Sequence, residues 1–295
     1  RILSGFFIPM MGATIFPLIV ELFEDEKRLF ITGIVQGAAS LAQLLALPLG
    51  ILSGDKIPWY FPFLLLIAIL IVSVILMLKL LEGEKNDTTS SININTYLAK
   101  YRSLIRDPKV FNYILLYALF GLSVFVVFGM YAYWLTKNGT GDSYQLAILF
   151  MFSGITELIA STTITRISKL FASPRNAMVL ILLVAIVSVL FMPLFANYII
   201  LQTLLFSLFS WVRSSINPLI FVEIYKNADI NDRGTLNGVM NASFQLATSV
   251  GGIIGTACLF YSPSFWLNAV IFTACIILCL LLTLRNLHHV NEVTK

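Results

Sequence analysis

The stretch WVRSSINPLIFVEIYKNADINDRGTLNGVMNASFQLATSVGGIIG occupies residues 211–255 and holds two apolar runs separated by a polar turn that ends at Arg233. A shorter version of this pattern opens the chain, because Arg28 lies 205 residues before Arg233 and Gly50 lies 205 residues before Gly255. Internal repeats of this kind are typical of membrane transporter folds. The spacing therefore predicts a chain built of two related halves, of which the first is incomplete.

The composition excludes a soluble protein. Hydrophobic residues make up 58% of the chain and charged residues 12%, against roughly 45–50% and about 25% in soluble domains. Apolar runs of about 20 residues, the length that crosses the hydrocarbon core of a bilayer, recur from end to end. We therefore predict an all-α, polytopic membrane protein with nine spans, at residues 2–22, 29–52, 59–81, 111–135, 144–165, 176–195, 198–222, 235–260 and 264–284.

The positive charges predict how these spans are oriented. If the spans alternate, fifteen of the 19 lysines and arginines fall on one side of the membrane, and such residues favour cytoplasmic loops. This places the C-terminus and the loop 82–110 in the cytoplasm of a cell whose plasma or inner membrane holds the protein. Because the net charge of +4 comes from loops between spans, it predicts no nucleic-acid partner.

The repeat also predicts the domain organisation. Spans seven to nine echo spans one to three, so we expect partners of spans four to six upstream of Arg1, in a protein of twelve spans truncated at its N-terminus. The predicted parts are the last three helices of the N-terminal six-helix half (1–81), an inter-half loop (82–110), a complete C-terminal six-helix half (111–287) and a tail (288–295).

The end of the loop 82–110 shows a helical pattern. One face carries apolar side chains, namely Leu98, Tyr101, Leu104 and Ile105, and another carries the basic side chains Lys100, Arg102 and Arg106. A basic amphipathic helix on the cytoplasmic leaflet fits this pattern, and a solvated connector is the alternative.

Two charges of opposite sign lie at membrane depth. Glu157 is central in the fifth span and Arg213 in the seventh. Because a charge there costs about 2.5–3.5 kcal/mol on insertion scales, we expect the two to face a shared interior. Desolvation favours a neutral carboxyl and a nearby guanidinium favours a charged one, so Glu157 could load and release a proton. The alternative is a permanent ion pair that fixes helix packing.

Amide and hydroxyl side chains form matching stripes on the second and eighth spans. These are Gln36, Ser40 and Gln43 on the second span, and Asn237, Asn241, Gln245 and Thr248 on the eighth. The stripes suit hydrogen bonds to a solute, or, alternatively, bonds between helices.

Aromatic side chains recur along the fourth span, at Tyr117, Phe120, Phe128, Tyr131 and Trp134. Such a face could bind flat or cationic amphiphiles, and lipid-facing rings are the alternative. Glycine pairs such as Gly50-x-x-x-Gly54 and Gly251-x-x-x-Gly255 predict close helix packing. Met10, beside Pro9, makes the first span adaptable.

These residues resemble the major facilitator superfamily, from its fourth transmembrane helix onward. Arg1-Ile-Leu-Ser-Gly5 is similar to the R-x-x-x-G signature of helix four, and Glu21 to Arg28 to the turn that follows it. The glycines and proline of the second span are similar to the helix-five motif of drug antiporters, although Leu47-Pro48 replaces the usual Gly-Pro. The segment from Arg166 to Arg175 is similar to the loop between helices eight and nine.

The resemblance implies an alternating-access secondary transporter, with nine of twelve transmembrane helices present. Its style is nearest to proton-coupled exporters of small amphiphilic drugs or metabolites, and a metabolite or nutrient importer of the same fold is the alternative. The predicted charge-handling groups are Arg1, Glu157 and Arg213, and the predicted cavity residues are Met10, Gln36, Gln43, Tyr117, Phe120, Asn217, Asn237 and Asn241.

The expected partners are a small-molecule substrate, protons and the lipid bilayer, with the chain as a monomer and with no metal or other cofactor. A membrane-embedded enzyme is disfavoured, because the two histidines, His288 and His289, lie in the tail and no aspartate lies at membrane depth. A non-transporting receptor or scaffold remains the alternative of another class.

Overall fold

The computed structural model describes residues 25–56, 58, 60–80, 101–138, 140–168, 170–171, 173–226 and 233–293. Within these ranges the chain is helical and has no strand. The elements are α2 (Asp25–Lys56), α3 (Phe61–Leu80), α5 (Pro108–Lys137), α6 (Ser143–Ser168), α7 (Pro174–Phe191), η1 (Pro193–Phe195), α8 (Ile199–Lys226), α9 (Arg233–Tyr261) and α10 (Trp266–Val293).

Eight of the nine predicted spans coincide with these long helices, and the first span, 2–22, lies outside the described residues. Seven of the helices are long and apolar enough to cross a membrane. The eighth, α2, has a shorter strongly apolar segment, Ser40–Ile51. The prediction of an all-helical membrane bundle is therefore confirmed.

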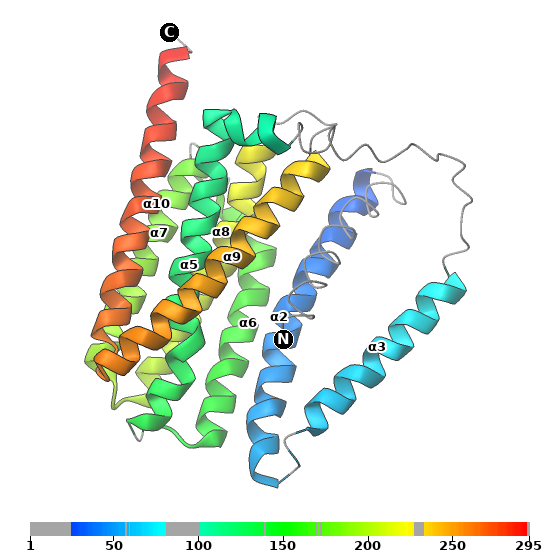
Figure 1. The fold of residues 1–295 in the computed structure, drawn as a ribbon, viewed down its shortest axis with the longest axis vertical. Coiled ribbons are helices and arrows are strands. Elements are labelled where there is room, and N and C mark those ends of the chain that lie inside the picture. The colour runs from blue at the N-terminus through cyan, green and yellow to red at the C-terminus, as the bar shows by residue number, and fades with distance from the viewer. Residues whose placement is uncertain are drawn as a thin grey trace.

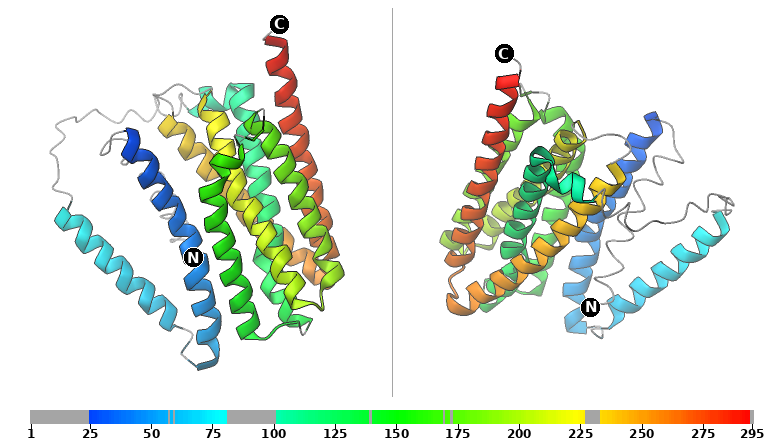
Figure 2. Two further views of the ribbon diagram at one scale, coloured as in Figure 1. Left: turned by 180° about the vertical axis from the view of Figure 1, so that it is seen from behind. Right: turned by 45° about the horizontal axis from the view of Figure 1, so that its top comes forward.

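Helices α5 to α10 form one bundle, which we call the C-terminal bundle (residues 108–293). In it, α9 runs diagonally across α5, and α6 lies beside α8 (Figure 1). On its other side α6 packs along α2, and this is the main junction between the C-terminal bundle and the helices before it. Helix α3 diverges from α2 after a short turn and stands apart from the bundle in all views (Figure 2).

Glycine allows α9 to approach α5 very closely. A Cβ atom added at Gly251 would lie 2.3 Å from the carbonyl oxygen of Leu122, and one at Gly255 would lie 2.5 Å from that of Val126. Asn268 of α10 fastens this crossing, because its amide donates to the carbonyl oxygens of Val126 (2.8 Å) and Gly255 (3.0 Å). The predicted packing role of this glycine pair is confirmed.

A different glycine from the predicted ones brings α2 against α6. A Cβ added at Gly154 would lie 2.7 Å from the backbone of Leu44. At Gly50 no described atom lies within 4 Å of an added Cβ, so close packing at this predicted position is not seen among the described residues. The contact at Gly154 places the polar face of α2 next to the middle of α6.

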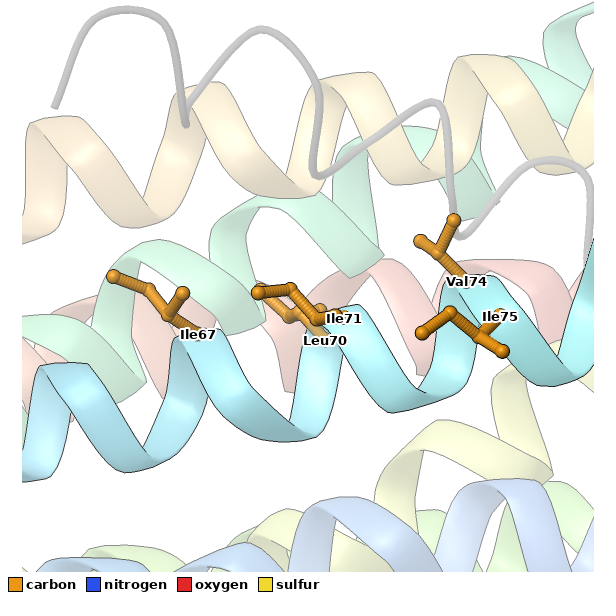
Figure 3. A pocket seen from close by; sticks show the side chains of 5 residues that line it. All are labelled: Ile67, Leu70, Ile71, Val74 and Ile75. Carbon is orange, nitrogen blue, oxygen red and sulfur yellow. The ribbon is translucent and has the colours of Figure 1, made fainter.

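Helix α3 is apolar on every side, and none of its most hydrophobic window is buried by other described residues. A shallow hollow on its surface is lined by aliphatic side chains alone, namely Ile67, Leu70, Ile71, Val74 and Ile75 (Figure 3). A helix that is hydrophobic all round suits a lipid environment. The hollow has no polar group that could orient a solute and is therefore not a candidate site.

The segment before α5 is described from residue 101 and is helical over residues 101–106. Leu104 is buried, whereas Tyr101, Arg102 and Ile105 are exposed. This helical segment stops before Pro108, which begins α5, because the residue before a proline is disfavoured in the helical region. The contact of this segment with a lipid surface stays a prediction.

Candidate functional site

Three helices bring polar side chains together inside the membrane span: α2 contributes Gln43, α6 contributes Ser153 and Glu157, and α8 contributes Arg213. The close contact at Gly154 explains why Gln43 reaches the other groups. The predicted meeting of Glu157 and Arg213 is confirmed, because the two side chains form an ion pair.

Arg213 is the hub of this cluster. Its Nε donates to Oε1 of Glu157 over 2.9 Å, and its Nη2 donates both to the same carboxylate oxygen and to Oε1 of Gln43. The other end of the Gln43 amide donates to Oγ of Ser153 over 2.8 Å. One glutamine of α2 therefore binds both partner helices, α6 and α8, through a single side chain.

The surroundings explain why these groups need one another. Glu157 is 4% exposed, Gln43 5% and Ser153 fully buried. A charge in such a place requires a partner and hydrogen bonds, since water is excluded. The guanidinium carbon of Arg213 also lies 4.7 Å from the ring centroid of Phe128, which adds a cation–π attraction. The site is thus electrically neutral while Glu157 is ionised.

One turn further along α8 lies Asn217, a predicted cavity residue. Positions four apart share a face of a helix, so Asn217 lies on the side that carries Arg213. Its Oδ1 is buried and has no hydrogen-bond partner among the described residues. A buried acceptor without a partner is uncommon and is often explained by a bound water or ligand. Its role as a cavity residue stays a prediction.

The predicted amide stripe of α9 is partly paired with itself. The amide of Asn241 donates to Oδ1 of Asn237 over 3.1 Å, and Asn237 is buried. Gln245, one turn further, is exposed. Both interpretations of the stripe, solute binding and contact between helices, therefore stay open.

Two predicted aromatic cavity residues are packed inside the C-terminal bundle. Tyr117 stacks on Phe244 with ring centroids 4.6 Å apart and meets the edge of Phe221 at 5.4 Å. Phe120 is 1% exposed. A role for either ring in binding would require the bundle to open at this point, and the assignment stays a prediction.

The remaining predicted residues are not placed with the cluster. Arg1 and Met10 lie outside the described residues. Gln36 lies on α2, two turns before Gln43, and its side chain is outside the part that the structure describes. Among the described residues, no group of three or more His, Cys, Asp or Glu side chains could hold a metal ion.

A second, partly buried ion pair was not predicted. Nε of Arg175, at the start of α7, donates to Oε2 of Glu223, near the end of α8, over 2.8 Å. The hydroxyl of Tyr113 lies beside both charges. The sequence did contain a signal, because the predicted span limits place Arg175 and Glu223 at the same membrane boundary.

Ionisable groups buried at membrane depth in a polytopic bundle are rare, and in membrane transporters they often mark the pathway of the substrate or ion. The chain matches the family model described as the Major Facilitator Superfamily over residues 1–252 and again over residues 138–294. The chain belongs to the Major Facilitator Superfamily, whose members are generally secondary transporters rather than enzymes. The comparison with curated proteins returns no significant match.

Proposed function

We propose that the chain carries out proton-coupled secondary transport, with Glu157 as the proton-binding group and Arg213 as its counter-charge. The single observation that supports this role is the bond of Arg213 to both Glu157 and Gln43. It links an ionisable carboxylate to the junction between α2 and α6, the helices that would move relative to each other in alternating access.

The order of events in the proposed cycle depends on the charge of Glu157. While it is ionised, the carboxylate holds the guanidinium, and the guanidinium holds Gln43. Protonation removes the negative charge and weakens the bond to Arg213. The Gln43 contact then becomes easier to break, so that α2 can shift on α6 and change the side of the membrane to which the site is open. Proton binding and the change of access are coupled in this way, because the charge of Glu157 affects both.

Export of a small amphiphilic drug or metabolite is the candidate that the resemblance to drug antiporters implies, and uptake of a small metabolite is the second candidate. The burial of Tyr117 and Phe120 favours the second candidate, because their rings offer no open aromatic face to a large amphiphile. In either case we place the protein in a plasma or inner membrane, with its C-terminus in the cytoplasm.

The test uses protein reconstituted in liposomes that contain a pH-sensitive dye, challenged with a panel of small carboxylates and amphiphilic cations. Solutes that are transported with protons change the internal pH. Glu157→Gln should still exchange such a solute across the membrane but should no longer move protons with it. Thr162→Val is a matched control on α6, because Thr162 is exposed and, among the described residues, its hydroxyl donates only to carbonyls of its own helix. Unchanged proton movement in Glu157→Gln would contradict the proposal.

A further inference from the structure

The two members of the central ion pair differ in their accessibility. The side chain of Arg213 is 22% exposed, whereas that of Glu157 is 5% exposed. The guanidinium binds both the Glu157 carboxylate and the Gln43 amide oxygen, and these two partners are the buried members of the cluster. A solute that reaches this site therefore meets the positive charge first.

The guanidinium also has an unused donor. Arginine carries five N–H donors in a planar fork. Nε and Nη2 are bound to Glu157 and Gln43, but within the described part of the chain Nη1 has no hydrogen-bond partner. The ring of Phe128 lies against the guanidinium, with its centroid 4.7 Å from the guanidinium carbon. Phe125 contacts Phe128, with ring centroids 5.9 Å apart, and both rings are partly exposed. The accessible surface thus combines a cationic donor with aromatic rings.

The charges decide which solute this surface accepts. The pair is neutral, so an anion that enters alone adds an uncompensated negative charge in a site with little water, which is costly. One proton on Glu157 removes that charge and frees the guanidinium for a second carboxylate, which it can bind bidentately. A cation would need to displace Arg213 from the less accessible partner. Among the described residues, Arg213 is the one charged side chain that contacts Glu157, and Gln43, Ser153 and Ser214 are neutral.

We propose that the substrate is an organic anion with an aromatic or apolar body, whose carboxylate pairs with Arg213 while Glu157 holds one proton. The anion and the proton occupy the site together and cross the membrane in the same direction, so that the step is electrically neutral. This inference rests on the proposed function and assigns the substrate class of the same site.

Benzoate is the simplest probe of this class, and tetraphenylphosphonium is the matched amphiphilic cation. Binding to the purified protein in lipid nanodiscs is measured by isothermal titration calorimetry at about pH 7.5 and about pH 5.5, where benzoate is still an anion. We expect benzoate to bind more tightly at the lower pH, by up to about tenfold per pH unit for one coupled proton. Glu157→Gln should bind benzoate tightly at both pH values, because its neutral amide imitates the protonated carboxyl.

Arg213→Gln should lose benzoate binding. Because this variant leaves a buried carboxylate unpaired, the neutral double variant Glu157→Gln/Arg213→Gln is measured beside it and should lose binding too. Thr162→Val should bind like the unchanged protein. Benzoate affinity that is independent of Arg213, or absent at millimolar concentration, overturns the inference. Tetraphenylphosphonium binding that is lost in Glu157→Gln also overturns it, but leaves the proton-coupling role of Glu157 intact.

Discussion

The ion pairs Arg175–Glu223 and Arg213–Glu157 contain the same two chemical groups and equally buried carboxylates, each with 5% of the side chain exposed. They differ in the helices that they join. Arg175–Glu223 joins α7 and α8 inside the C-terminal bundle, whereas Arg213–Glu157 joins α6 and α8 and also holds Gln43 of α2. The same kind of ion pair therefore lies wholly within the bundle in one place and reaches a helix outside it in the other, where we propose that it controls the junction with α2.

The position along α8 explains part of this difference. Glu223 follows Arg213 by ten residues, which is about 15 Å along a helix axis. Arg175 lies in the first turn of α7, after the N-cap Ser173 and Pro174. A cation there is opposed by the positive end of the helix dipole, and Glu223 compensates for this. The pair at the bundle end thus also offsets an unfavourable charge at a helix end, whereas Arg213 and Glu157 of the central pair lie in the middle of their helices.

The largest expected effect comes from removing the central arginine. Arg213→Leu leaves Glu157 buried without a partner, and breaking a buried pair in this way costs about 3–5 kcal/mol. Glu157→Leu/Arg213→Leu should recover most of that stability, because no charge remains, but should not recover transport. Thermal unfolding in detergent measures the first effect and proteoliposome flux the second. Equal stability of the single and double variants would show that the central charges do not interact.

The next prediction distinguishes a role in proton coupling, expected for Glu157, from a structural role, expected for Glu223. Glu157→Gln should lower the steady-state accumulation of substrate driven by a proton gradient by at least about tenfold, because the proton-binding group is absent. Glu223→Gln should change the transport rate or the stability but not the accumulation ratio, which depends on proton stoichiometry alone. If Glu223→Gln abolishes accumulation and Glu157→Gln does not, the roles of the two pairs are exchanged.

The sequence predicted the helices and their buried charges better than it predicted the contacts between helices. Apolar runs marked the spans, and the lone opposite charges Glu157 and Arg213 were expected to meet because a buried charge needs a partner. Close helix packing at Gly251 and Gly255 was also predicted, since small residues four apart let backbones approach closely, but the partner helix α5 was not.

What the sequence did not predict depends on how two helices are aligned along their lengths. The contact of Gly154 with Leu44 and the bonds of Gln43 to Ser153 and Arg213 require a specific relative shift and rotation of α2 and α6. No local pattern encodes that alignment, because many shifts bury similar apolar surfaces. The Arg175–Glu223 pair was not predicted for the same reason, since it depends on how α7 and α8 are aligned. The predicted spans nevertheless placed both residues near the same membrane boundary.

A third prediction tests whether the contact between α2 and α6 affects the central pair Arg213–Glu157 and leaves the pair Arg175–Glu223 unchanged. In Gly154→Val the new side chain would collide with the backbone of Leu44, which lies 2.7 Å from the Cβ position. Overpacking of this kind costs about 1–3 kcal/mol and should separate Gln43 from Arg213. Double electron–electron resonance between spin labels on α2 and α6 should show the increased distance, while a label pair on α7 and α8 reports no change near Arg175–Glu223. Gly50→Ala is the control on α2, because no described atom lies near its added methyl group.

The smallest effect is expected at Gln43. Gln43→Leu removes a bond to a charged group and a bond to Ser153, and should lower stability by about 1–2 kcal/mol. A matched variant is Gln202→Leu, since Gln202 is also a buried glutamine but, in the part of the chain that the structure describes, its side chain bonds only within the C-terminal bundle, to Tyr131 and to the carbonyl of Met192. Both variants should unfold at lower temperature, but only Gln43→Leu should change how often α2 moves relative to α6, as measured by single-molecule fluorescence transfer between the two helices. If both variants leave that motion unchanged, Gln43 contributes to packing and does not connect the charge of Glu157 to the movement of α2.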